Sequence, residues 1–150
     1  MSEALRTVVI AFGALAIGFT WQALRTAAIP AASPDRLVGE LRLAQMAALL
    51  LTLTAGAYIG FAVVRENQPG VALDIVIAVC FLLVAAVTML RDPRQALTIV
   101  ALAFAAHAIV DVLHRPGLLP DGLTPRWYAV SCAVYDLYIG ALCYLPVLRR

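Results

Sequence analysis

Five separate apolar runs constrain the fold of this sequence more than any other feature. Each is about 20 residues long, the length that an α-helix needs to cross a hydrocarbon core of roughly 30 Å. The composition agrees, because 63% of the residues are hydrophobic and only 13% are charged, whereas a soluble domain is about half apolar and a quarter charged. We therefore predict an all-α, polytopic transmembrane bundle of five helices, forming a single integral-membrane domain over residues 1–150. The predicted spans are roughly 6–26, 42–64, 71–90, 95–114 and 126–147.

The prolines separate these runs, since seven of the eight fall outside the predicted spans. The eighth, Pro146, lies in the last turn of the fifth span, where a helix tolerates it because it is already ending. The prolines assigned to the four connections, in chain order, are Pro30 and Pro34, then Pro69, then Pro93, and finally Pro116, Pro120 and Pro125.

An alternative interpretation of the first run is a secretory signal, because the segment AAIPAAS after it supplies the small residues that a cleavage site needs. The run is too long for a signal, and Trp21, Gln22 and Arg25 intervene before any cleavage site. We expect a first transmembrane helix.

Arginine supplies every positive charge of this lysine-free chain and predicts the orientation. In a five-span topology, the richer side should be cytoplasmic, with the N-terminus outside and the C-terminus inside. An Arg- and Ala-rich chain without lysine is typical of a GC-rich bacterial genome, so we expect a bacterial inner membrane. The chain has no basic run of the kind that predicts binding to nucleic acid. The richer side holds Arg25, Arg36, Arg42, Arg91, Arg94, Arg149 and Arg150, and the other side holds Arg6, Arg65, Arg115 and Arg126.

The segment 107-HAIVDVLH-114 places three ionisable residues at the end of an apolar run. At 100° per residue, His107, Asp111 and His114 lie within about 60° of the helix circumference, so they share one face. That face cannot be turned toward lipid, because an ionisable side chain in the bilayer is costly unless it is paired. The fifth span carries a second polar stripe, which comprises Tyr128, Cys132, Tyr135 and Asp136.

The two polar faces should meet, because the fourth and fifth spans are joined by a short connection and should pack antiparallel. A rise of about 1.5 Å per residue puts Asp111 and Tyr128 close to the membrane edge, His107 and Cys132 about 10 Å below that edge, and Asp136 about a turn deeper. Asp74 lies in the first turn of the third span, which starts on the same side, near a helix N-terminus that favours a carboxylate. We therefore expect one polar pocket near the outer face.

This pocket predicts a metal site. Three carboxylates repel one another unless a proton or a cation neutralises them, and His and Asp spaced by three or four residues lie on adjacent helical turns, as in helical metal sites. The predicted ligands are His107, Asp111 and His114. His107 and His114 are about 10 Å apart along the helix axis, so we expect one pair to bind with a residue of another helix, or Asp111 to anchor the ligands. Nitrogen and oxygen ligands favour zinc, iron or manganese.

The predicted function is a metal site near the outer face that acts on a lipophilic substrate, with membrane lipid as the first partner. In an enzyme, Asp136 or Asp74 would accept a proton and Tyr128 or Tyr135 would donate a hydrogen bond. Two alternatives remain open. The carboxylates can form the proton or ion pathway of a carrier, or the His–Asp–Tyr network can simply hold helices together in an accessory subunit of a larger complex.

Small residues with helical spacing predict close helix contacts. Gly56 and Gly60 form a G-x-x-x-G pattern, and Ala14 with Gly18 repeats the spacing. Such faces can serve the bundle, a homo-oligomer or a partner membrane subunit. The cysteines form no C-x-x-C pair, and we interpret Cys80 and Cys143 as small core residues.

The stretches HAIVDVLHR (107–115) and WYAVSCAVYD (127–136) together resemble the C-terminal part of the DUF6010-like small bacterial membrane proteins, which carry a similar H-x-x-x-D-x-x-H, a proline-bearing loop and C-x-x-x-D. The resemblance covers about the last 45 residues of this chain. It implies that His107, Asp111, His114, Cys132 and Asp136 belong to one site, and it implies no known activity.

Overall fold

The computed structural model describes residues 3–114, 118–119 and 124–149, and within these it consists of helices and their connections. The helices are α1 (Glu3–Ala28), α2 (Pro34–Val64), α3 (Val71–Thr88), α4 (Pro93–Leu113) and α5 (Arg126–Leu148). Each is long and apolar enough to cross a membrane. The prediction of an all-α bundle of five membrane-spanning helices is confirmed.

Helix α2 begins at Pro34, eight residues before the predicted start at residue 42. Ser33 caps it, because the Ser33 hydroxyl accepts a hydrogen bond from the Asp35 amide at 3.3 Å. Proline suits the first helical position, where its missing N–H would have no partner within the helix. Pro34 therefore starts a helix, as Pro93 does for α4. The predicted placements of Arg115, Pro116 and Pro120 lie outside the described residues.

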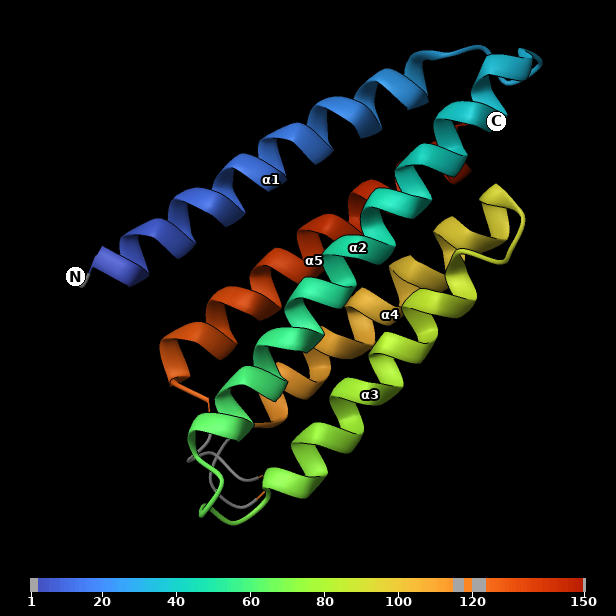
Figure 1. Ribbon diagram of the computed structural model, residues 1–150. Coiled ribbons are helices and arrows are strands. Elements are labelled where there is room, and N and C mark those ends of the chain that lie inside the picture. Colours follow the sequence, from blue (N-terminus) through green and yellow to red (C-terminus); the bar gives the residue numbers. More distant parts are fainter. Residues whose placement is uncertain (1–2, 115–117, 120–123, 150) are drawn as a thin grey trace.

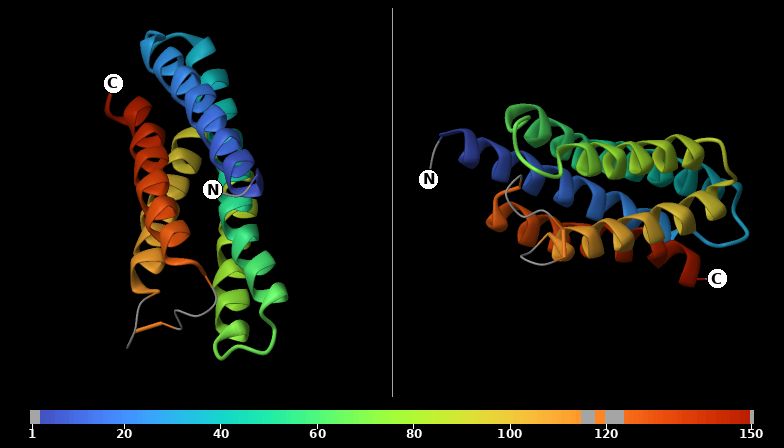
Figure 2. Two further views of the ribbon diagram at one scale, coloured as in Figure 1. Left: turned by 90° about the vertical axis from the view of Figure 1, so that its left-hand side faces the viewer. Right: turned by 90° about the horizontal axis from the view of Figure 1, so that it is seen from below.

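The five helices form two hairpins with a fifth helix beside them. Figures 1 and 2 show α2 alongside α3 and α4 alongside α5, and the two hairpins contact each other where α4 meets α2 and α3 and where α5 meets α2. Helix α1 packs against α2 and α5. The chain runs up and down, so the start of α1 lies at the same end as the 65–70 connection, the end of α4 and the start of α5 (Figure 1).

The core is narrow and the outer surface is apolar, as expected of a bundle that faces lipid. Phe19, Leu51 and Phe104 are fully buried, whereas Ile17 and Leu102 are mostly exposed. Gly140 allows α5 to approach α4 closely, since a Cβ there would lie 3.2 Å from the Ala101 carbonyl oxygen and 3.3 Å from the Phe104 Cβ. This close approach brings the polar faces of the two helices together.

Arg36 holds the opposite end of the bundle together. It is only 2% exposed, whereas we predicted it as one of the charges of the first connection. Its Nε donates to Glu40 at 2.7 Å, so an ion pair compensates the burial of both charges. Nη1 donates to the carbonyls of Thr26 and Ile29 at 2.9 and 2.8 Å, and Nη2 donates to those of Pro146 and Arg149 at 2.7 and 3.2 Å. All five N–H groups of the guanidinium thus have a partner, and they join the ends of α1 and α5 to α2.

Candidate metal centre

The polar faces of α4 and α5 meet inside the bundle. His107 and Asp111 of α4 and Cys132 and Asp136 of α5 are all buried, and each offers one potential ligand atom. These four atoms lie within 4.8 Å of one another. The cluster, which we call the His–Asp–Cys–Asp group, can hold a metal ion.

The contacts within the group centre on one nitrogen. His107 Nδ1 lies 2.6 Å from Asp136 Oδ2 and 3.5 Å from Asp111 Oδ2. With its proton on Nδ1, the imidazole donates to Asp136. Cys132 Sγ donates to the same Asp136 oxygen at 3.8 Å. One histidine, two carboxylates and one thiol therefore share a single small volume.

The backbone explains why His107 reaches Asp136, which we predicted to lie a turn deeper. Side chains of an α-helix lean toward its N-terminus. Helices α4 and α5 are antiparallel, so His107 leans deeper into the bundle while Asp136 leans toward the end where α5 begins. The spacing of four residues in each helix, His107 to Asp111 and Cys132 to Asp136, then places two pairs opposite each other.

Tyr58 of α2 completes the surroundings of the group, and the sequence analysis missed it. Its hydroxyl donates a hydrogen bond to Asp111 Oδ1, and its ring stands edge-on to the His107 ring with centroids 5.5 Å apart. Phe81 of α3 contacts His107 from another direction at 4.7 Å. The only available signal was that Tyr58 is the single tyrosine of the predicted span 42–64.

His114 and Asp74 form a second pair outside the His–Asp–Cys–Asp group. His114 Nε2 lies 3.0 Å from Asp74 Oδ1, and His114 Nδ1 lies 2.8 Å from the Val110 carbonyl oxygen. Both ring nitrogens thus face oxygen acceptors, which leaves neither free to bind a metal ion in this arrangement. The structure brings His107, Asp111 and Asp136 together and places His114 with Asp74. Tyr58 links the two sets, since its ring also lies 5.2 Å from the His114 ring.

Six buried side-chain oxygens have no hydrogen-bond partner among the described residues. A buried oxygen without a partner loses the hydrogen bonds that water would give it, at a cost of about 1–3 kcal/mol. Two of these oxygens belong to the His–Asp–Cys–Asp group, and two are hydroxyls of the α5 tyrosines. They are Asp74 Oδ2, Asp111 Oδ2, Thr124 Oγ1, Tyr128 OH, Tyr135 OH and Asp136 Oδ1.

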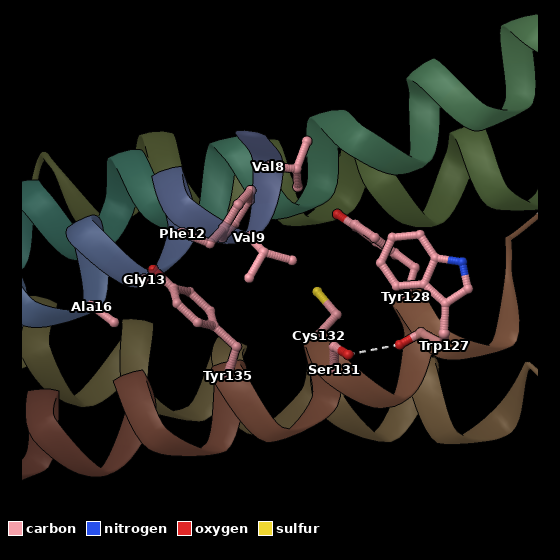
Figure 3. Close-up of a pocket in the computed structure, with 10 residues that line it drawn as sticks. All are labelled: Val8, Val9, Phe12, Gly13, Ala16, Trp127, Tyr128, Ser131, Cys132 and Tyr135. Carbon is pink, nitrogen blue, oxygen red and sulfur yellow. Dashed lines mark hydrogen bonds between the residues drawn. The ribbon is translucent and has the colours of Figure 1, made fainter. Parts of the chain in front are cut away.

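A cavity of about 290 Å³ between α1 and α5 adjoins the group. Figure 3 shows the side chains of the two helices facing each other across it. Cys132 belongs both to the cavity wall and to the His–Asp–Cys–Asp group. Tyr128, which we predicted as a hydrogen-bond donor, and Tyr135 line the same wall. The group is therefore approached from the cavity on its Cys132 side.

The chain matches no protein-family model, and it has no significant match among curated proteins or solved structures. The resemblance to DUF6010-like proteins stays a prediction. What can be said of the site rests on its geometry.

Proposed function

We propose that this multi-pass membrane protein binds one divalent metal ion through His107, Asp111, Cys132 and Asp136, and uses it on a lipophilic substrate. The observation that supports this most strongly is the arrangement of the four buried ligand atoms within 4.8 Å of one another, on two adjacent helices. Structural and catalytic zinc sites draw on the same set of histidine, cysteine and carboxylate ligands.

Charge supports a bound cation. Asp111 and Asp136 are both buried, and a single histidine lies between them. Two carboxylates that share one site in a low dielectric repel each other strongly. A divalent cation is attracted to these two carboxylates, and Asp111 Oδ2, which has no hydrogen-bond partner among the described residues, can bind it.

The cysteine narrows the choice of metal. From histidine and aspartate alone we expected zinc, iron or manganese. A thiolate ligand favours zinc and iron over manganese, which prefers oxygen ligands. Zinc is the ion that we propose, because it accepts nitrogen, sulfur and carboxylate ligands in one tetrahedral site.

The surrounding side chains support a catalytic role for the metal ion in addition to a structural one. A zinc ion held by these four residues would act as a Lewis acid, and it would acidify a water molecule that it took up as a fifth ligand. Asp136 is placed to accept a proton, since its Oδ1 has no other partner, whereas Asp74 is held by His114 at 3.0 Å. Tyr128 offers an unpartnered hydroxyl on the same face of α5. Tyr58 holds Asp111 in place through its hydrogen bond.

A proton pathway is the second candidate. Tyr58 contacts the rings of both His107 and His114, so ionisable side chains follow one another from the end of α4 into the bundle. Proton-dependent flux in liposomes containing the purified protein, lost in Tyr58→Phe, would favour this candidate over metal chemistry.

We further propose a bacterial inner membrane and an orientation with the N-terminus outside and the C-terminus inside. The arginine distribution supports it, and the metal centre then lies toward the outer end of α4. The glycine faces of α2 remain open to a second copy or a partner subunit, since a Cβ at Gly56 or Gly60 would meet nothing within 4 Å. A periplasm-sensitive and a cytoplasm-sensitive reporter fused in turn to the C-terminus test the orientation.

Elemental analysis tests the metal proposal. Detergent-purified protein, prepared without chelator and loaded with zinc, should carry near-stoichiometric metal that His107→Ala and Asp111→Ala both lose. Wild-type protein that binds no zinc, iron or manganese would refute the proposal.

A further inference from the structure

A second cavity lies at the opposite end of the bundle from the His–Asp–Cys–Asp group. It has a volume of about 460 Å³ and lies between the end of α1 and the start of α2, which Figure 1 shows side by side. Arg25 of α1 and Arg42 and Asp35 of α2 are among the residues that line it. The two helices approach closely there, because a Cβ at Gly39 would lie 3.1 Å from Thr26 Cγ2. The cavity is therefore a polar space between two packed helices.

Helix geometry brings two guanidinium groups to this cavity from different helices. Side chains of an α-helix lean toward its N-terminus. Helices α1 and α2 are antiparallel, so Arg25, in the last turn of α1, leans back into the membrane, whereas Arg42 leans out toward the start of α2. The guanidinium carbon of Arg25 accordingly lies 5.2 Å from the centre of the Trp21 ring, one turn back along α1. Arg25 and Arg42 thus lean toward the same depth.

The protein does not compensate these two charges. The ion pairs among the described residues involve neither Arg25 nor Arg42. Asp35 is the acidic residue of the cavity wall, and it lies in the first turn of α2, where the helix dipole already stabilises a carboxylate. Two arginines and one aspartate leave the wall with one net positive charge. A singly charged anion would offset that charge.

The depth of the cavity matches that of lipid head groups. Helix α2 has 31 residues and is thus about 46 Å long, whereas the hydrocarbon core is about 30 Å thick. The first turns of α2 therefore reach into the head-group region. Arg42 lies about 12 Å from the start of α2, and its long side chain carries the charge back toward the head groups. Trp21 is 60% exposed, as is typical of a tryptophan at the membrane interface.

We propose that this cavity binds the phosphate of an anionic membrane phospholipid between Arg25 and Arg42. Arginine binds phosphate through paired N–H donors, and basic pockets between transmembrane helices bind anionic lipid head groups. The bound phosphate offsets the repulsion between the two guanidinium groups and bridges α1 to α2. Such a bridge stabilises the helix that needs it most, because α1 is the least buried of the five. The site is independent of the metal centre.

Native mass spectrometry of the delipidated protein in detergent measures the binding of added phosphatidylglycerol. We expect one lipid to bind at low concentration. Arg42→Gln should raise its dissociation constant by about fivefold, the factor expected for one arginine at an anionic lipid surface, and Arg25→Gln/Arg42→Gln should raise it further. Arg149→Gln is the matched control, because Arg149 is an exposed arginine at the same end that is not among the residues lining the cavity. Equal dissociation constants in Arg42→Gln and Arg149→Gln would overturn the cavity as the binding site.

Two further probes test what the cavity recognises. Diacylglycerol with the same acyl chains lacks the phosphate and should bind at least about fivefold more weakly, and equal binding would overturn recognition of the phosphate. Millimolar inorganic phosphate should leave the lipid bound. Displacement of the lipid would identify a site for free phosphate and overturn the assignment to a phospholipid.

Unfolding in SDS tests the bridge between α1 and α2. A ligand that binds only the folded state raises stability, so phosphatidylglycerol should increase the resistance of the wild type and of Arg149→Gln to unfolding. It should have a much smaller effect on Arg25→Gln/Arg42→Gln. Equal stabilisation of all three proteins would contradict a lipid that holds α1 to α2 through these arginines.

Discussion

Removing the Tyr58 hydroxyl should weaken metal binding without emptying the site. Tyr58→Phe keeps the ring that contacts His107 and His114, and it removes only the hydrogen bond to Asp111 Oδ1. A hydrogen bond to a charged group contributes about 1.5–3 kcal/mol. Loss of a partner that orients a metal ligand lowers affinity by about 10- to 100-fold, or about 1.4–2.8 kcal/mol. The two estimates agree, so we expect a loss in this range.

Competition with a zinc chelator in detergent measures this change. Tyr138→Phe is the matched control, because the Tyr138 hydroxyl pairs with Thr20 of α1 at 2.6 Å instead of with a residue of the metal group. It should bind zinc like the wild type. A Tyr58→Phe protein with wild-type affinity would show that Asp111 is not a ligand held by Tyr58, and the reasoning would fail at that contact.

Three further predictions concern the rest of the bundle. Arg36→Met should destabilise the protein by about 3–5 kcal/mol, because Glu40 stays buried without its main partner. The Arg94 side chain is half exposed and lies 3.4 Å from Glu40, so Arg94→Met should change stability by less than about 1 kcal/mol. Unfolding in SDS compares the two variants, and equal losses of stability would contradict the role of Arg36. Gly140→Val should lower the stability of the protein by about 1–3 kcal/mol by forcing α4 away from α5, and it should also lower zinc affinity. Gly56→Val should change neither stability nor zinc affinity. Unchanged zinc affinity in Gly140→Val would show that the close approach of α4 and α5 does not determine the geometry of the metal group. His114→Ala should retain near-stoichiometric zinc by elemental analysis, and loss of the metal would return His114 to the ligand set.

Most of the fold and much of the candidate site could be predicted from the periodicity of the sequence. The apolar runs are long and separated by prolines, so the number and nature of the helices followed from the sequence. The faces that hold His107 and Asp111, and Cys132 and Asp136, also followed, because residues four apart lie together on any α-helix.

Contacts between distant helices could not be predicted in the same way. Tyr58 and Arg36 of α2 each form hydrogen bonds with residues of other helices. A single residue of this kind leaves no periodic pattern in the sequence, so neither contact could be predicted. His114 shared a helical face with His107 in the sequence pattern, yet it lies at the end of α4, where Asp74 of α3 is its neighbour. Which of two nearby acidic residues a histidine meets depends on helix packing, and that is fixed by tight contacts such as the one at Gly140.

The central claim is that one metal ion is bound by His107, Asp111, Cys132 and Asp136, and cobalt substitution tests it most directly. Purified protein loaded with Co²⁺ in place of zinc should show the visible bands of a tetrahedral site together with a thiolate-to-cobalt charge-transfer band in the near ultraviolet. Cys132→Ser should lose the charge-transfer band, and His107→Ala should lose all of these bands. A wild-type spectrum without them, or a charge-transfer band that survives in Cys132→Ser, would contradict the account.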